Sequence, residues 1–292
     1  MEEVLSQAKK VAEEAEVFSL ASEETEVQFE ANRLKRLETK QTTNIALRII
    51  RQGRIGYAIT TRLDDIKSLV DNAVETAQFG IPAKFQLPSR TSYPSIKVFD
   101  DAVETVPTEA MIKLGGELIA KVTAHTPGIV CEAGVSKGAV TVRIINSRGG
   151  EARYQKTFFS LGIEGNLVRG TDMLFVGESK SSCHPFSESK EVADIVIQQL
   201  ELAKERASVA TQSLPVVFTA NGVASALIIP LMAAFNGKTV LEGASPIGSK
   251  LGQKGFSDKL WLWDDPTMLY RPSSRPCDDE GVPSQRTPLI EQ

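Results

Sequence analysis

The sequence predicts an α+β protein built from duplicated helix and antiparallel-strand units, followed by the start of a mostly β C-terminal domain. Long stretches alternate between apolar and polar residues, as half-buried strands do. The strands come in runs and do not alternate singly with helices, which favours antiparallel sheets in an α+β arrangement. The order of helix, strands and closing helix occurs twice, and this repetition suggests an internal duplication.

The first predicted unit covers residues 1–96. Residues 1–18 are charged and amphipathic, which predicts a helix at the N-terminus. Residues 16–61 alternate in hydrophobicity and predict several antiparallel strands. One face of these strands carries Ile45, Leu47 and Ile49.

Two signals organise the rest of this unit. Gln52-Gly53 interrupts the apolar pattern and predicts a hairpin turn, because glycine accepts positive φ. Residues 63–78 place apolar side chains at helical spacing, which predicts a helix that covers the sheet. A proline-containing stretch without periodicity follows, so residues from about 80 to 96 are predicted to be a linker.

The second predicted unit covers residues 97–210 and repeats the order of the first. Residues 108–125 have helical periodicity, and residues 129–182 have the alternation of strands. Residues 189–208 predict the closing helix. The two predicted units therefore share an architecture but little sequence.

Residues 211–292 are predicted to be the start of a C-terminal domain that is incomplete. Residues 214–218 predict a buried strand, and the apolar run 222–235 predicts a buried helix. The remainder is rich in Gly, Ser, Pro and Asp, which is typical of loops between short strands.

Composition and charge exclude several classes of protein. The formal net charge of -4 provides no general attraction for phosphates, so nucleic acid is not an expected partner. The longest apolar run, residues 222–235, is shorter than the roughly 18 to 20 residues that cross a bilayer, so no membrane span is expected. The three cysteines are widely spaced without a CxxC pair, which fits a reducing compartment better than a disulfide framework.

The chain contains two histidines, His125 and His184, which excludes a three-histidine metal site and an HExxH helix. His125 ends a predicted helix, where an imidazolium interacts favourably with the helix dipole, so we favour a capping role. Cys183 precedes His184, but adjacent side chains of an extended backbone point to opposite faces. A nucleophilic dyad of these two residues is therefore disfavoured.

Two other segments have weak similarity to ligand-binding motifs. GASPIGSK (243–250) approaches a phosphate-binding loop, but Ser249 precedes Lys250 where that motif needs the reverse order. We interpret it as a turn-rich loop whose free N–H groups leave a peptide-backbone or anion contact open. The basic region 32–54 is interpreted as a solvated strand face, because no aromatic residues interleave with it for base stacking.

The segment WLWDDPTMLYRPSSRPCDDEG (261–281) concentrates carboxylates around Cys277. A metal site would require these side chains to converge in space. Aspartates also initiate turns by accepting hydrogen bonds from their own backbone, and we favour this interpretation. Trp261 and Trp263 are expected to anchor a strand. The carboxylates are those of Asp264, Asp265, Asp278, Asp279 and Glu280.

Three segments carry a family resemblance. They are FEANRLKRLET with IALRIIRQGRIGYAITTRLDDIKSLVDNAVETA, then LEGASPIGSKLGQKGFSDKLWLWDDPT, and finally CDDEGVPSQRTPLIE. In this order they resemble the TldD/PmbA family, also called TldD/TldE or modulator of DNA gyrase proteins, over essentially the whole chain. Family members continue past the residues that match 289–291, so the resemblance predicts a C-terminally truncated member.

The resemblance implies a cytoplasmic two-subunit metallopeptidase that acts on peptides or unfolded proteins. In such complexes the TldD-type chain binds zinc through an HExxxH helix and a late cysteine, and a metal-free homologue, PmbA or TldE, pairs with it. The corresponding helix here lies within about residues 224–243 and contains no histidine. Its Leu, Ile, Met and Ala side chains cannot ligate zinc or deprotonate a bound water.

We therefore expect a PmbA/TldE-like subunit with no catalytic residues, no metal ligands and no cofactor of its own. Zinc is expected in a TldD-type partner, and pairing with a second copy of the chain is the other expected assembly. The subunit would complete a substrate cleft in which an extended peptide is held by strand addition. The predicted substrate-binding residues lie in the Gly/Ser-rich loop and are Ser245, Gly248, Ser249 and Gly252.

Two alternatives remain open. One is a non-proteolytic regulatory or binding protein that contacts DNA gyrase or nucleic acid through residues 32–54. The other is an independent hydrolase that uses Cys183 or a serine, although no GxSxG elbow is present. The family is a metallopeptidase family, but without HExxxH this chain is not expected to be catalytic alone.

Overall fold

The computed structural model describes residues 1–62 and 64–291, and the chain divides into two compact units. Unit 1 consists of Met1–Glu205 and Pro266–Gln285, and unit 2 consists of Arg206–Asp265 and Arg286–Gln292. Leu63 and Gln292, which belong to the predicted ranges 63–78 and 211–292, lie outside the described residues.

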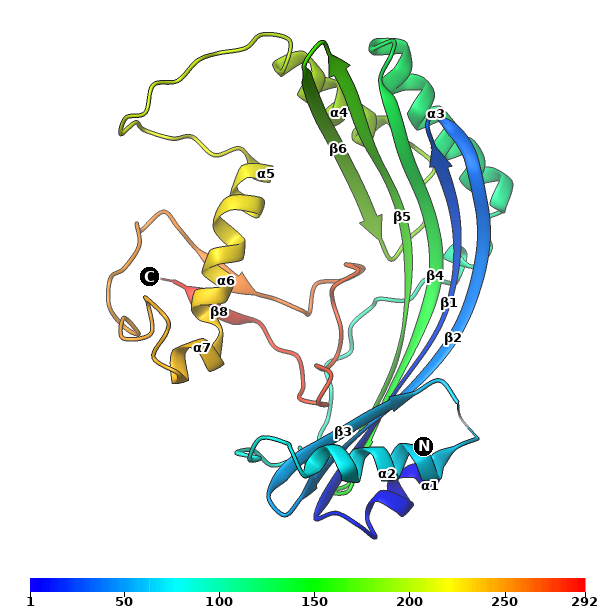
Figure 1. Ribbon diagram of the computed structural model, residues 1–292, viewed down its shortest axis with the longest axis vertical. Coiled ribbons are helices and arrows are strands. Elements are labelled where there is room, and N and C mark those ends of the chain that lie inside the picture. Colours follow the sequence, from blue (N-terminus) through cyan, green and yellow to red (C-terminus); the bar gives the residue numbers. More distant parts are fainter. Residues whose placement is uncertain (63, 292) are drawn as a thin grey trace. The chain divides into compact units, whose positions relative to one another are not determined.

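Unit 1 contains an antiparallel six-stranded sheet with the strand order β3-β2-β1-β4-β5-β6, and its long central strands curve together (Figure 1). The strands are β1 (Glu14–Glu30), β2 (Arg33–Arg51), β3 (Arg54–Thr60), β4 (Val130–Asn146), β5 (Glu151–Arg169) and β6 (Asp172–Ser182). The helices are α1 (Glu2–Ala8), α2 (Ile66–Ala77), the 3-10 helix η1 (Asp101–Val103), α3 (Thr108–His125) and α4 (Lys190–Leu202).

Tight turns set the register of the first three strands. Between β2 and β3 the turn residues Gln52 and Gly53 have φ of 52° and 69°, which confirms the predicted hairpin. Between β1 and β2, Asn32 has φ of 66°, and its side chain reaches the start of β4. There its Oδ1 accepts a hydrogen bond of 2.7 Å from the Cys131 N–H. One turn residue therefore connects the first meander to the second.

Helices cover one face of the sheet through two apolar clusters. Helices α3 and α4 pack on β1, β4, β5 and β6, where Leu118 and Phe159 are almost completely buried. Helices α1 and α2 pack on the other end of the strands, over Leu47 and Ile49. The predicted apolar face that includes Ile45 is thereby confirmed, because these side chains are at most 9% exposed.

The α+β class is also confirmed, and each predicted unit contributes three strands and a closing helix. The two meanders join through β1 and β4, which pair from Glu16↔Asn146 to Phe29↔Ala133. They therefore share one sheet inside unit 1. The proposed domain boundaries near residues 96 and 210 stay predictions.

Two predicted elements need correction. The N-terminal helix ends at Ala8 and does not continue to residue 18, because β1 begins at Glu14 and pairs with β2 from Glu14↔Ile50 onward. Residues 214–218 do not form the predicted buried strand. No described strand pairs with them, and Val217 is 94% exposed.

Unit 2 is built from short elements. Helical turns α5 (Ala220–Gly222), the π-helix η2 (Val223–Ile228) and α6 (Ile229–Phe235) follow one another directly, and α7 (Gly237–Leu241) comes next. Strands β7 (Leu262–Asp264) and β8 (Thr287–Ile290) form a two-stranded antiparallel sheet.

The apolar helix of residues 222–235 forms, but the prediction that it is buried is wrong for the described residues. Ile229 is 68% exposed, and Ala234 is the buried side chain of this stretch. The described residues of unit 2 leave most side chains of the helix from Val223 onward partly or largely exposed. None of the helices described here combines the length and the hydropathy that a membrane crossing needs.

Candidate functional site

The predicted Gly/Ser-rich loop borders a cavity of about 950 Å³ in unit 2. The end of α6, most of residues 247–260 and β8 form its wall. Gly248 and Gly252 belong to the described lining, whereas Ser245 and Ser249 do not. The structure thus brings two of the four predicted residues to the cavity.

The two serines have local hydrogen bonds. The Ser245 hydroxyl donates to the Ala234 carbonyl at 2.7 Å and accepts from the Ile247 N–H at 3.2 Å, which fixes the loop against the end of α6. The Ser249 carbonyl accepts a bond of 3.1 Å from the Gln253 side chain. These hydrogen bonds fix the conformation of the loop that borders the cavity.

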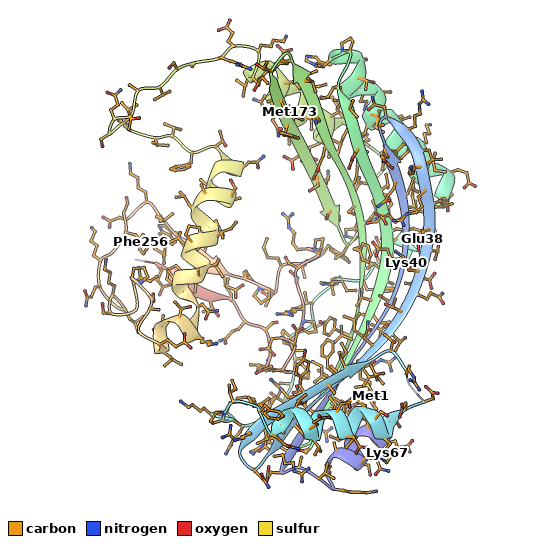
Figure 2. The ribbon with its side chains drawn as sticks, in the orientation of Figure 1. Met1, Glu38, Lys40, Lys67, Met173 and Phe256 are labelled. Atoms are coloured by element: carbon orange, nitrogen blue, oxygen red, sulfur yellow. The ribbon has the colours of Figure 1, made fainter. Side chains whose placement is uncertain are left out.

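Sequence reasoning missed the apolar residues that give this cavity its chemistry. The signal in the sequence was that large apolar residues occur in a loop that is otherwise rich in Gly, Ser and Lys. Phe256, which Figure 2 labels, belongs to this loop. An apolar cavity of this kind suits the side chain of a peptide or another small apolar group. The apolar lining includes Phe235, Leu251, Phe256, Leu260 and Ile290.

The helical stretch Ala220–Phe235 contains a π-helix, a feature that is frequently found at functional sites. The Thr219 hydroxyl caps its start by accepting from the Gly222 N–H at 3.1 Å. The stretch contains no His, Cys, Asp or Glu. Its side chains therefore do not fit a zinc ion, which takes nitrogen, sulfur or carboxylate ligands.

The carboxylates of segment 261–281 divide between the two units. Asp264 and Asp265 belong to unit 2, and the later three belong to unit 1. Asp278 Oδ1 accepts from the N–H groups of Glu280 and Val282, each at 2.9 Å. This geometry confirms the turn interpretation for Asp278.

The two tryptophans of the preceding segment, which were expected to anchor a strand, are partly exposed. Trp261 and Trp263 are 48% and 37% exposed, with their ring centroids 5.6 Å apart. The Arg286 guanidinium lies 4.3 Å from the Trp263 ring centroid. The two tryptophans thus contact each other and an arginine, and a large part of each side chain remains exposed.

A charge network joins Glu280 to the face of the sheet opposite the helices. Arg48 donates to Glu280 Oε1 at 2.5 Å and to Glu16 Oε1 at 2.9 Å. Glu16 is only 4% exposed, and its Oε2 has no hydrogen-bond partner among the described residues. Burial raises the pKa of Glu16 to about 7 although Arg48 acts in the opposite direction, and the nearby Glu280 and Asp278 add to the rise.

The two histidines have structural partners in unit 1. His125 Nε2 lies 2.6 Å from Glu201 Oε1 and therefore ties the end of α3 to α4, in agreement with a role at the helix end. His184 Nδ1 lies 2.5 Å from Asp100 Oδ2. This contact with His184 is the main cause that lowers the pKa of Asp100.

Cys183 has the environment of a buried structural thiol. Its side chain is 0% exposed, and burial raises its pKa, so the thiolate form needed for nucleophilic attack is disfavoured. The nearby Lys156 acts in the opposite direction but is the smaller influence. The alternative of a cysteine hydrolase therefore loses its support.

The basic region 32–54 is matched by glutamates. Arg36 forms ion pairs with Glu38 at 3.0 Å and with Glu26 at 3.7 Å. Lys40 also pairs with Glu38, at 3.3 Å, and Figure 2 places both on β2. Such pairing favours the interpretation as a solvated strand face over a nucleic acid-binding surface.

Within the part of the chain that the structure describes, no three His, Cys, Asp or Glu side chains come close enough together to hold a metal ion. The features that remain as a candidate site are the cavity beside the Gly/Ser-rich loop and the π-helix of the same unit.

Comparison with known proteins adds two family matches. Residues 15–77 match the model of the PmbA/TldA metallopeptidase domain 1, and residues 211–292 match the model of the PmbA/TldA metallopeptidase C-terminal domain. An uncharacterised protein of Methanocaldococcus jannaschii is 27% identical over 299 residues, which covers 100% of this chain and 68% of that protein.

Solved structures share the fold. TldE from Thermococcus kodakarensis has a TM-score of 0.81 at 21% identity and covers 100% of this chain, which spans 67% of that protein. A Thermotoga maritima protein described as a modulator of a DNA gyrase has a TM-score of 0.81 at 16% identity. It covers 99% of this chain, which again spans 67% of its relative. The chain therefore spans about two thirds of the length of these proteins.

Proposed function

This chain belongs to the PmbA/TldD family, and we propose that it is a PmbA/TldE-like subunit that binds no zinc and completes the peptide-binding cleft of a zinc-bearing, TldD-type partner. The observation that carries the proposal is the helical stretch Ala220–Phe235, which has no His, Cys, Asp or Glu. In the resemblance described above, a TldD-type chain places its zinc motif on this helix.

The remaining histidines support the same assignment. His125 and His184 belong to unit 1, and each is in contact with a carboxylate of that unit, Glu201 or Asp100. Zinc and the general base would therefore come from the partner chain. The proposal places the complex in the cytoplasm, with peptides or unfolded proteins as its substrates.

The contribution of this chain to the substrate cleft would come from unit 2. The sheet of β7 and β8 has only two strands, so each strand has an outer edge that can accept an extended peptide through main-chain hydrogen bonds. The cavity beside Gly248 and Gly252 opens on β8 and is lined by apolar side chains that could receive one side chain of such a peptide. Ser245 and Ser249 would act indirectly, by holding the loop in shape.

A regulatory role without proteolysis is the second candidate, because one solved relative is described as a modulator of a DNA gyrase. The ion pairs of Arg36 and Lys40 make a direct contact of residues 32–54 with nucleic acid less favourable. Duplex DNA titrated at rising salt tests this candidate, since a nucleic acid complex loses affinity steeply as salt increases.

The decisive experiment purifies this chain alone, a TldD-type partner alone, and the two after co-expression. Each sample is then analysed for zinc and for cleavage of an unfolded casein substrate. We expect co-purification, zinc in samples that contain the partner, and cleavage that is greatest in the mixture. A partner variant whose HExxxH histidines are replaced by alanine serves as the control and should remove both zinc and cleavage from the mixture.

Stoichiometric zinc in this chain alone, or cleavage by it alone, would overturn the proposal. Failure of the two chains to associate would remove the heteromeric assembly and leave the pairing of two copies of this chain, which sedimentation at several protein concentrations measures.

A further inference from the structure

We propose that the open face of the sheet in unit 1 carries a second binding surface, specific for an extended peptide segment with basic side chains. The surface is a groove of about 1140 Å³ over β1, β4, β5 and β6. Most of its exposed lining side chains lie on the face opposite α3 and α4, because they alternate with those buried under these helices. Gln199 of α4 reaches the groove at β6, where it bonds to Gly177. This inference goes beyond the proposed function and needs neither zinc nor a second subunit.

The centre of the groove floor carries two glycines side by side. Strand pairing aligns Gln28 with Gly134, Gly134 with Gly162, and Gly162 with Ser179. We call these four residues the glycine lane. With neighbouring strands about 4.8 Å apart, the lane crosses four strands over roughly 14 Å, which is the length of about four residues of an extended peptide.

The lane is open above its centre. A Cβ atom added to Gly134 would meet no heavy atom within 4 Å, although this glycine sits in a regular strand. Glycine in the interior of a strand weakens the sheet and often marks a place where another backbone approaches closely. A Cβ atom added to the neighbouring Gly162 would lie 3.3 Å from the Ser179 Cβ, so the room for a backbone to lie on the sheet is greatest above Gly134.

One wall of the groove carries an uncompensated pair of like charges. Glu132 and Glu164 face each other directly across β4 and β5. Both are exposed, and neither has an ion-pair partner within 4.0 Å among the described residues. Like charges directly opposite each other destabilise a sheet, so a cation at this position would relieve the repulsion.

Other glutamates of the same sheet have cationic partners. Glu26 pairs with Arg36 at 3.7 Å and Glu30 pairs with Lys35 at 3.2 Å. Glu26, Glu30 and Lys35 also line the groove. Lys35 is therefore already neutralised by its neighbour. The glutamate pair beside the glycine lane differs from these two glutamates in that its members face each other directly and have no cationic partner among the described residues, so a basic ligand could supply one.

The next row along the strands supplies further contacts. Asn166 pairs with Val130 and Phe175, and its Oδ1 is shielded from solvent without a hydrogen-bond partner. This acceptor suits an N–H or guanidinium donor. Val130 and Phe175 are 49% and 70% exposed and can pack against the aliphatic stem of an arginine or lysine.

These features favour one occupant. A polypeptide backbone fits the glycine floor, arginine or lysine side chains match Glu132 and Glu164, and their stems match Phe175. A nucleic acid or another phosphate ligand would meet the same glutamates with repulsion. The partner is therefore a basic, extended peptide segment.

The test uses the full chain and a fluorescein-labelled peptide of ten residues that alternates arginine and threonine. Fluorescence anisotropy measures its affinity at two salt concentrations, beside a matched peptide that has glutamate in place of arginine. We expect saturable binding of the basic peptide, weaker binding at high salt, and no binding of the acidic peptide. The double variant Glu132→Gln/Glu164→Gln should lose roughly tenfold in affinity.

Two further variants locate the site. Gly134→Val should fold at least as well as the parent, since valine is favoured in strands, and should abolish binding by filling the lane. Glu23→Gln/Glu24→Gln changes the net charge by the same amount elsewhere on β1 and should bind as the parent does. Thermal unfolding of each variant verifies the fold.

Absence of binding by the parent protein would overturn the proposal, as would equal affinity for the acidic peptide. Undiminished affinity in Gly134→Val, or equal losses in the two glutamine double variants, would show that the contact is elsewhere and would equally overturn it.

Discussion

Unit 1 and unit 2 differ in what covers their apolar side chains. In unit 1, α3 and α4 lie on the sheet and bury Leu118 and Phe159 to 1% exposure or less. In unit 2, Leu241 and Leu251 are at least 90% exposed, and the helix from Val223 to Phe235 has one buried residue. An apolar segment therefore becomes part of a core only where the same unit supplies a second layer of secondary structure that packs on it.

The largest loss of stability is expected when a side chain in the core of unit 1 is shortened. Leu118→Ala removes a side chain that is 0% exposed between α3 and the sheet. The lost burial and the cavity left behind should lower the free energy of unfolding by about 2–5 kcal/mol. Urea unfolding followed by circular dichroism measures this change, and a loss below about 1 kcal/mol would contradict the description of this cluster as a tightly packed core.

A second effect concerns pH. The pKa of Glu16 is about 7 in the folded chain against an ordinary value of 4.5, so the folded state holds a proton that the unfolded state has released between these values. The free energy of unfolding should therefore fall as pH rises from about 4.5 to about 7, by an amount on the order of 1–3 kcal/mol.

Glu16→Gln keeps an acceptor for Arg48 and removes the titration. Urea unfolding at a series of pH values should show that the free energy of unfolding depends less on pH for this variant between pH 5 and pH 7. The stability of the variant relative to the parent should therefore increase toward high pH. An identical slope in both proteins would show that Glu16 is not the group responsible.

A smaller change in stability is expected at the Asp278 turn, which lies within unit 1. Asp278→Asn retains Oδ1 as an acceptor for the N–H groups of Glu280 and Val282, and loses only the charge of the carboxylate. We expect a loss of stability below about 1 kcal/mol and an unchanged metal content. Zinc analysis of both proteins after expression with the partner checks this, and metal lost from a folded variant would revive the carboxylates as ligands.

The smallest effect should come from unit 2. Ile229→Ala shortens a side chain that is 68% exposed, so the unfolding free energy should change by less than about 0.5 kcal/mol. The same urea titration as for Leu118→Ala provides the measurement. A loss of unfolding free energy comparable to that of Leu118→Ala would show that the two units do not differ in the burial of their apolar side chains. It would indicate a contact that covers the helix in solution.

The sequence predicts what depends on local periodicity. The alternation through Ile45, Leu47 and Ile49 gives the buried face of β2, and Gln52-Gly53 gives the turn after it. Both signals depend only on neighbouring residues, because side chains alternate in direction along a strand and positive φ favours particular residue types. The α+β class follows from the succession of such segments.

What the sequence does not predict depends on which strands meet. Glu132 faces Glu164 only because β4 and β5 pair in one register, and a shift by one residue would turn either side chain to the other face. Arg48 contacts Glu280, which lies 232 positions away. Hydrophobicity likewise misleads at Val216 and Val217, because exposure depends on a covering layer that no short window contains.

The course of the chain between the units has a mechanical consequence. The backbone leaves unit 1 after Glu205, returns at Pro266 and leaves again after Gln285, so three peptide crossings connect the units. Segment 266–285 of unit 1 is therefore connected covalently to unit 2 at both of its ends. A protease that cuts only the first crossing would produce the two fragments 1–205 and 206–292, which are then held together only by noncovalent packing of residues 266–285 within unit 1, such as that of Cys277 against Ile144.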